Sequence, residues 1–176
     1  MRVFFALPLK EQLKLDIEQW QINNLPPSSH SVPTANFHIT LAFTGTIRDS
    51  DLGLLFERTD EILKTGDFKT GSLKLIETGF WAKPEILWIG PKVWPENLTK
   101  LANKLQNVGR NFGAKKEKKA FRPHLTLSKK SSAPSCPTSP PDFNLQYDQI
   151  VLYQSIPIKS GVKYVDIQSW PLMPNS

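Results

Sequence analysis

The sequence predicts an α+β fold in which two pseudo-symmetric lobes of antiparallel sheet, flanked by helices, face a central cleft. Three observations support this prediction. Segments with helical spacing are mixed with short strand-like runs along the chain. A His-x-Thr-Leu tetrad occurs twice, at residues 38–41 and 124–127. A helical segment precedes each tetrad, and a long hairpin-like stretch follows it, at 68–89 and 143–165. A plain α+β domain without internal symmetry is the alternative.

The spacing of apolar residues predicts the individual helices and strands. The helices span 9–22, about 50–63 and about 95 to 109 or 113. Asp49 or Ser50 supplies the N-cap of the second helix, and Pro95 suits the first turn of the third. The strands span 2–7, 38–43, 68–78, 86–89, 123–127, 150–154 and 162–170, with turns at Lys83-Pro84 and Ser160-Gly161. Stretches rich in proline and serine, 23–33 and 131–141, predict exposed loops.

Length and composition place the chain among ordinary globular proteins. With 176 residues, we expect residues 1–176 to form a single domain of two intertwined lobes. No segment has the length of a membrane span. Residues 1–8 hold too short an apolar run and too little charge for a signal peptide, and they are better interpreted as a strand. Cys136 is the only cysteine, which excludes a disulfide framework and favours a reduced, cytoplasmic protein.

Each tetrad places an imidazole beside a hydroxyl on one face of a strand. Because side chains alternate along a strand, His38 and Thr40 share one face while the two apolar residues share the other. The same alternation pairs His124 with Thr126. The chain holds only three histidines, and two of them lie in this setting. The repeated pattern therefore indicates an active site.

Two imidazoles across a cleft suit an in-line displacement at phosphorus. An imidazole titrates near neutral pH, so one can take a proton from the attacking oxygen while the other gives a proton to the leaving oxygen. Thr40, Thr126 and a charged imidazole can stabilise the charge on the non-bridging oxygens. This chemistry needs no metal. The sequence has no cluster of carboxylates near either motif, which argues against a two-metal phosphatase. We therefore expect neither a metal nor another cofactor.

Each candidate residue also has a purely structural interpretation. A single histidine on a strand is more often structural than catalytic, and a single threonine is often only a good strand former. The repetition of the tetrad favours the catalytic interpretation. A metal held by the two histidines would need a third ligand. His30, the only other histidine, lies in a loop of proline and serine and is expected to have no function.

The net charge is +6, and positive charge is concentrated around the second tetrad. Four lysines at 115–119 precede it, Arg122 lies just before His124, and Lys129 and Lys130 follow. A basic surface attracts polyanions such as RNA or DNA, but a solvated lysine loop explains the same pattern.

Together these residues resemble the 2H phosphoesterase superfamily, which is named for two His-x-Thr motifs. Within it the chain is most similar to the bacterial and archaeal RNA 2′,3′-cyclic phosphodiesterases, first described as 2′-5′ RNA ligases. The resemblance covers nearly the whole length: the opening Arg2–Ala6, the block Phe37–Phe43 with Gly45, and the block Pro123–Leu127. It implies a bilobal α+β fold around a central cleft. It also implies hydrolysis of a 2′,3′-cyclic phosphate at an RNA end to a 2′-phosphate.

The resemblance further implies roles for individual residues. By that analogy His38 is the proton donor to the leaving 3′ oxygen and His124 is the proton acceptor that activates water, although the sequence alone does not distinguish the two. Thr40 and Thr126 would bind the phosphate. Phe43 would stack on the terminal base, with simple core packing as the alternative.

One position departs from the family pattern. Relatives often carry arginine two residues after the leucine of the second motif, where this chain has Lys129. A lysine can neutralise a phosphate but cannot form the bidentate fork of an arginine. Two hypotheses follow: affinity for the RNA end is weaker, or Arg122 takes over part of this role.

Two other functions stay open at this point. The chain could be a different 2H enzyme, acting on a 2′-5′ oligonucleotide or on ADP-ribose cyclic phosphate, or joining RNA ends as a 2′-5′ RNA ligase. It could also be a non-catalytic RNA-binding protein that uses the basic cluster. The expected partner is RNA with a 2′,3′-cyclic phosphate or a 2′-5′ linkage, and no membrane. We expect a monomer, because the sequence has no coiled-coil heptad and no long exposed apolar stripe.

Overall fold

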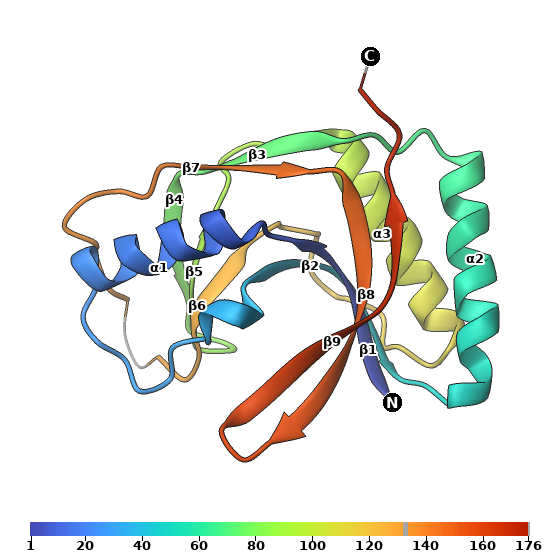
Figure 1. The fold of residues 1–176 in the computed structure, drawn as a ribbon, viewed down its shortest axis with the longest axis horizontal. Coiled ribbons are helices and arrows are strands. Elements are labelled where there is room, and N and C mark those ends of the chain that lie inside the picture. The colour runs from blue at the N-terminus through green and yellow to red at the C-terminus, as the bar shows by residue number, and fades with distance from the viewer. Residues whose placement is uncertain (132–133, 176) are drawn as a thin grey trace.

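A computed structural model describes residues 1–131 and 134–175, and it confirms the α+β class (Figure 1). The α-helices of the described residues are Glu11–Asn24 (α1), Leu52–Thr65 (α2) and Glu96–Asn111 (α3). Their strands are Arg2–Pro8 (β1), His38–Thr46 (β2), Gly71–Leu75 (β3), Glu77–Trp81 (β4), Ile86–Gly90 (β5), Leu125–Ser128 (β6), Phe143–Tyr147 (β7), Gln149–Ile158 (β8) and Gly161–Pro171 (β9). Single 3₁₀ turns precede β2 and α2, at Thr34–Asn36 (η1) and Asp49–Asp51 (η2).

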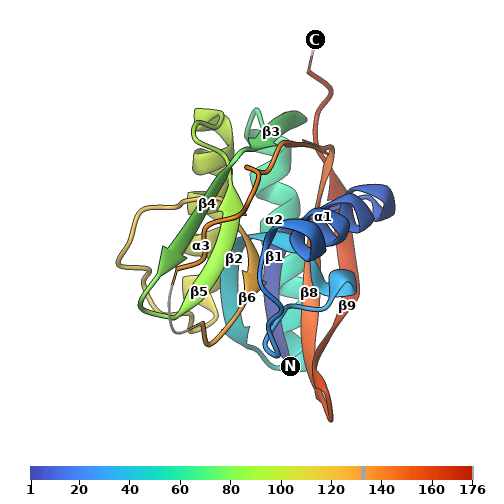
Figure 2. The ribbon, with the colours of Figure 1, turned by 90° about the vertical axis from the view of Figure 1, so that its left-hand side faces the viewer.

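The strands of the described residues form three antiparallel sheets, and two of these sheets hold one motif each. The first motif lies in the four-stranded sheet β2-β1-β8-β9, and the second lies in or directly before β6 of the three-stranded sheet β4-β5-β6. A third sheet pairs only β3 with β7. Figure 2 shows β2 of the first sheet beside β6 of the second, which agrees with direct contacts between these two strands.

Helices α2 and α3 cover one face of the four-stranded sheet and leave the other face to the motif. Helix α3 packs on β2, and α2 packs on α3. On the covered face the ring of Phe5 lies 5.9 Å from that of Trp170, whose indole N–H donates to Asp60 Oδ1 of α2 at 2.6 Å. Since side chains alternate along β1, Phe4 points to the opposite face, where its ring lies 5.0 Å from that of His38.

Bulges in β2 decide which side chains share the face with His38. Pro8 pairs with His38, Ala6 with Thr40, Phe5 with Ala42, and Phe4 with Phe43, so the register shifts between Phe5 and Ala6. Strict alternation from His38 would turn Phe43 to the helix-covered face. The bulge instead brings Phe43 to the motif face, next to Phe4 at a ring distance of 5.9 Å.

The three-stranded sheet presents Trp88 of β5 beside the second motif. Trp88 is paired with Gly79 on one side and with Thr126 on the other. A Cβ atom on Gly79 would lie 2.1 Å from Trp88 Cζ2, so the indole can lie across β4 only because residue 79 has no side chain.

The segment before β2 connects the two sheets. Val32 N–H donates to Leu127 O at 2.8 Å, and Lys129 N–H donates to His30 O at 3.0 Å. Residues 30–32 therefore run along the free edge of β6 before the chain enters β2. This backbone pairing brings the first motif close to the second. Ser31 and Ser128 form the bridge between the two edges.

One predicted strand is wrong. Residues 68–78 do not form a single strand, because the chain changes sheets at the exposed Ile76: β3 pairs with β7, whereas β4 pairs with β5. The two hairpin-like stretches, 68–89 and 143–165, are likewise not simple hairpins. Their first strands pair with each other, a contact between distant parts of the chain that local spacing does not reveal.

The other predicted elements are confirmed with shifted ends. Helix α2 begins at Leu52 rather than after Asp49 or Ser50, which lie in η2, and no side-chain hydrogen bond caps it. Strand β6 begins at Leu125 rather than at Pro123, and the last two strands are longer than predicted. Residues 131 and 134–141 form no helix or strand; 132–133 lie outside the described residues. The symmetry of the two lobes stays a prediction.

Candidate active site

His38 opens strand β2 and has both ring nitrogens engaged. Its Nδ1 lies 2.7 Å from Asn36 O, and its Nε2 lies 2.9 Å from Thr40 Oγ1. Because a carbonyl oxygen can only accept, Nδ1 carries a proton and donates it to Asn36. In the neutral imidazole, Nε2 is then the acceptor and Thr40 donates to it. Nε2 carries no proton in this state and bonds only to a hydroxyl, so it is the atom that can accept a proton.

Aromatic side chains enclose the imidazole of His38. Its ring centroid lies 5.0 Å from Phe4, 5.2 Å from Tyr164 and 6.3 Å from Tyr153. Removal from water lowers the pKa of His38 from 6.5 to about 4, which the hydrogen bond to Asn36 only partly opposes. The positive charges of Lys129, His124 and Lys14 contribute smaller parts of this lowering of the pKa. In the free protein His38 is therefore neutral at pH 7.

His124 directly precedes β6 and has the same backbone tether. Its Nδ1 lies 2.9 Å from Arg122 O, so Nδ1 donates and Nε2 is again the free atom. The imidazole meets the rings of Trp81 and Trp88 edge-on, at 4.6 and 6.4 Å. Burial lowers the pKa of His124; the hydrogen bond to Arg122 raises it, and the charge of Arg122 lowers it.

The fold brings the two predicted histidines to one site. Strands β2 and β6 are in contact, and the charge of His124 acts on the pKa of His38. Thr126 faces Trp88 across the β5–β6 pair. Among the described residues, a hydrogen bond between the imidazole and the threonine of the same motif occurs only in the first motif.

The three predicted binding residues lie around the histidines in different states. The side chain of Phe43 is 52% exposed, which argues against the core-packing alternative. Arg122 already has partners: its guanidinium lies over the Trp88 ring at 4.9 Å, and its Nη2 is 3.5 Å from Glu77 Oε2. Lys129 is exposed, and its charge reaches His38.

Sequence reasoning missed the residues that hold and enclose the imidazoles. Asn36 and Arg122 stand two positions before their histidines, and each gives its backbone carbonyl to Nδ1. That common spacing is visible in the sequence, but its meaning requires the backbone geometry. The enclosing rings of Tyr153, Tyr164 and Trp81 come from distant strands, and only the tertiary fold reveals them.

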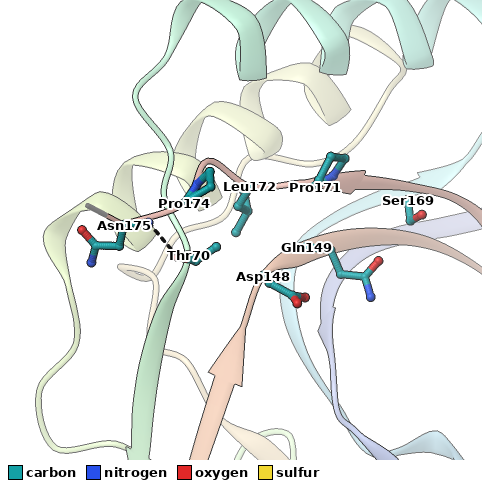
Figure 3. A pocket seen from close by; sticks show the side chains of 8 residues that line it. All are labelled: Thr70, Asp148, Gln149, Ser169, Pro171, Leu172, Pro174 and Asn175. Carbon is teal, nitrogen blue, oxygen red and sulfur yellow. Dashed lines mark hydrogen bonds between the residues drawn. The ribbon is translucent and has the colours of Figure 1, made fainter.

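Away from the motifs, a hollow of about 640 Å³ lies at the C-terminal end of the chain. Figure 3 shows the side chains that line it. Its lining residues are Thr70, Asp148, Gln149, Ser169, Pro171, Leu172, Pro174 and Asn175. None of the motif residues belongs to this lining. The described residues contain no group of three or more histidines, cysteines or carboxylates placed to hold a metal ion. In that same part of the chain, no helix has the length and apolar character needed to cross a membrane.

The chain is 30% identical to a protein of Escherichia coli K12 named RNA 2′,3′-cyclic phosphodiesterase, over 97% of this chain and 96% of that protein. It belongs to the RNA 2′,3′-cyclic phosphodiesterase family. A protein of Methanocaldococcus jannaschii with the same name is 27% identical over 73% of this chain and 71% of its own length. No protein-family model matches the chain.

Solved structures agree with this assignment to the RNA 2′,3′-cyclic phosphodiesterase family. The crystal structure of E. coli LigT with 3′-AMP has a TM-score of 0.87 and 26% identity and covers 97% of both chains. That of LigT with NADP⁺ has a TM-score of 0.86 and 26% identity and covers 98% of this chain and 97% of LigT. The predicted membership of the 2H phosphoesterase superfamily and the predicted enzyme class are thus confirmed. The roles of individual residues stay predictions.

Proposed function

We propose that this enzyme hydrolyses 2′,3′-cyclic phosphates at RNA ends to 2′-phosphates, using His38 and His124 and no metal. The carrying observation is the matched tether of the two imidazoles. Each donates Nδ1–H to a backbone carbonyl two residues earlier, so each keeps Nε2 for proton transfer. The name of the E. coli relative supports the choice of substrate.

In the proposed reaction, a water oxygen attacks phosphorus in line with the 3′ oxygen. His124 Nε2 takes a proton from the water, the bond between phosphorus and the 3′ oxygen breaks, and His38 Nε2–H protonates that oxygen. The product carries a 2′-phosphate and a 3′-hydroxyl. Each histidine has then exchanged its protonation state, and proton exchange with solvent restores both.

This role requires His38 to be protonated when substrate is bound. An anionic phosphate next to Nε2 stabilises the imidazolium and raises its pKa from the low value of the free protein. Protonation also frees the Thr40 hydroxyl, which in the neutral state donates to Nε2. Thr40 can then donate to a non-bridging oxygen, and Thr126 does the same from the second motif.

The charges near the two histidines favour an anion. The lysines that act on the pKa of His38 are Lys129 and Lys14, and the charge that acts on His124 is that of Arg122. Such a site attracts phosphate and repels a metal cation. We propose that Lys129 and Arg122 neutralise the phosphate and that Phe43 stacks on the terminal base.

Other 2H activities are tested by comparing substrates, because they would use the same motifs. RNA with a 2′,3′-cyclic phosphate is compared with a 2′-5′-linked oligonucleotide, ADP-ribose cyclic phosphate and a pair of RNA ends to be joined. A clear preference for one of the last three would replace the proposed substrate. The non-catalytic alternative is disfavoured, because the curated relatives are named as enzymes.

The decisive experiment measures hydrolysis of a short RNA with a 2′,3′-cyclic phosphate in EDTA. Wild type is compared with His38→Ala, His124→Ala and, as the matched control, His30→Ala, which removes the exposed third histidine. We expect turnover to a 2′-phosphate that a 3′-specific phosphatase cannot remove. The two motif variants should lose about 10²- to 10⁴-fold in kcat. Loss of wild-type activity in EDTA, or full activity of either motif variant, would contradict the proposal.

A further inference from the structure

The segment Lys115–Lys119 is a basic loop between α3 and β6 that the proposed reaction does not use. It reads Lys-Lys-Glu-Lys-Lys, and all five side chains are exposed. The ion pairs among the described residues involve other cations: the N-terminus, Lys14, Arg48, Lys69 and Arg122. With four lysines and Glu117, this basic loop therefore presents a net positive charge to the solvent.

The basic loop starts beside Phe43. Ala114 N–H donates to Gly109 O at 3.0 Å, and Gln106 Nε2 donates to Lys115 O at 3.3 Å. A Cβ atom placed on Gly109 would lie 3.0 Å from Phe43 O and 3.4 Å from Ala114 Cβ. The first residues of the loop thus lie against the end of β2 that carries the exposed Phe43 ring.

The basic loop ends at the second histidine. Phe121, just after it, packs on the core, and Arg122 is fixed over Trp88 and holds His124 through its carbonyl. The loop therefore spans the distance from Phe43 to the tether of His124. Its two ends are thus fixed near Phe43 and near the tether of His124, and its four lysines are exposed to solvent between these ends.

We infer that the basic loop Lys115–Lys119 binds the sugar-phosphate backbone of the RNA strand that leads to the cyclic phosphate. This inference rests on the proposed function, which places the terminal base at Phe43. The preceding nucleotides then leave the site next to the exposed lysines. Flexible ammonium groups contact phosphates without reading bases. The interaction therefore raises the affinity for longer RNA, whatever its sequence.

The test compares a short and a long substrate. The variant Lys115→Gln, Lys116→Gln, Lys118→Gln, Lys119→Gln removes the loop charge. We expect KM for a 12-nucleotide RNA with a 2′,3′-cyclic phosphate to rise about tenfold or more at low salt. The slope of log KM against log salt should fall by about 0.7 for each lysine that contacts a phosphate. For a nucleoside 2′,3′-cyclic phosphate, kcat and KM should stay at the wild-type values.

A matched control removes the same charge elsewhere. Lys64, Lys92, Lys100 and Lys104 are also exposed, lie in or near α2 and α3, and are changed together to glutamine. This control should keep the wild-type KM for the 12-mer. Equal weakening in both quadruple variants, or none in the loop variant, would overturn the inference.

Binding alone keeps the result independent of catalysis. The affinity of the same three proteins for a fluorescent 12-mer with a 3′-hydroxyl is measured by anisotropy. The loop variant should again bind more weakly than the control. Failure of the wild type to hydrolyse the 12-mer with a 2′,3′-cyclic phosphate would refute the proposed function, whereas equal affinities of the loop variant and the control in this assay would refute the basic-loop inference.

Discussion

The two motif histidines share a backbone tether but differ in what surrounds the imidazole. His38 is enclosed by Phe4, Tyr153 and Tyr164 and bonded to its own threonine, and its pKa falls to about 4. His124 meets two indole edges, and its pKa is lowered mainly by burial. The same four-residue motif thus places two imidazoles, both with a pKa lowered mainly by burial, in different surroundings.

This difference bears on which histidine gives and which accepts the proton. In the free protein His38 is neutral at pH 7, the state of a base, while the resemblance assigns it the role of acid. The two statements agree if the bound phosphate supplies the missing stabilisation of the imidazolium. Because the pKa of His38 is low in the empty site, His38 is then protonated at pH 7 only when an anion is bound. Three predictions test how the two histidines differ.

The largest expected effect concerns the assignment of acid and base. A cyclic substrate with sulfur at the 3′ bridging position has a leaving group that needs no proton. We expect His38→Ala to lose about 10²- to 10⁴-fold in kcat on the oxygen substrate but less than about tenfold on the sulfur substrate. His124→Ala should lose equally on both, because water still needs its base.

Single-turnover kinetics with both substrates measure this pattern, and thermal melts confirm that both variants fold. The opposite pattern, with sulfur rescuing His124→Ala, would exchange the two roles. Equal losses of both variants on both substrates would exclude a general acid at the 3′ oxygen.

The second prediction concerns stability at low pH. Between pH 6.5 and about 4 the unfolded chain binds a proton at His38 that the folded protein does not bind, so the free energy of unfolding falls as the pH falls. The shift from 6.5 to about 4 corresponds to about 2 kcal/mol between pH 7 and pH 4.5. Urea unfolding of wild type and His38→Gln at both pH values measures it.

Wild type should lose about 2 kcal/mol more than His38→Gln over this range. Carboxylates that titrate in the same range contribute equally to both proteins, so the difference isolates His38. Binding of inorganic phosphate should raise the pKa of His38, which histidine proton NMR follows directly. Parallel pH profiles of the two proteins would show that the imidazole titrates normally in the fold.

Local pattern predicted the candidate histidines but not their surroundings. Alternation along a strand predicted the faces of His38 and Thr40, because that rule depends only on backbone geometry. It could not predict the bulge that turns Phe43 to the same face, since a bulge is set by pairing with β1. Nor could it predict the β3–β7 pair, which joins residues some seventy positions apart.

The pKa of each histidine was out of reach for the same reason. Desolvation dominates the shift at His38, and the enclosing Tyr153 and Tyr164 follow the motif by more than a hundred residues. A motif therefore identifies the candidate acid–base group, whereas distant strands decide its protonation state.

The smallest of the three effects tests the tether itself. Asn36 accepts from His38 through its backbone and donates its side-chain amide to Val162 O of β9 at 2.9 Å. The tether of His38 is thus fixed by the same hairpin that supplies Tyr164. We expect Asn36→Ala to lower kcat about tenfold with little change in KM, because the carbonyl that orients His38 loses its anchor. The pKa of His38 should change as well, as this carbonyl bond raises it in wild type.

The control is Asn97→Ala, which removes a comparable bond to Asp67 O at 2.7 Å and also the bond that Asn97 Oδ1 accepts from Lys69 N–H at 3.1 Å, away from both motifs. Asn36→Ala should lose about 1 kcal/mol of stability and Asn97→Ala about 2 kcal/mol, because one such hydrogen bond usually contributes about 1 kcal/mol. Only Asn36→Ala should change kcat and the titration of His38. If the two variants behave alike, Asn36 is merely a structural residue, and the orientation of His38 depends on the aromatic enclosure alone. A selective effect would instead show that the β8–β9 hairpin acts on the reaction through the side-chain amide of Asn36. The second histidine is held differently, because its tether Arg122 is fixed by the ring of Trp88.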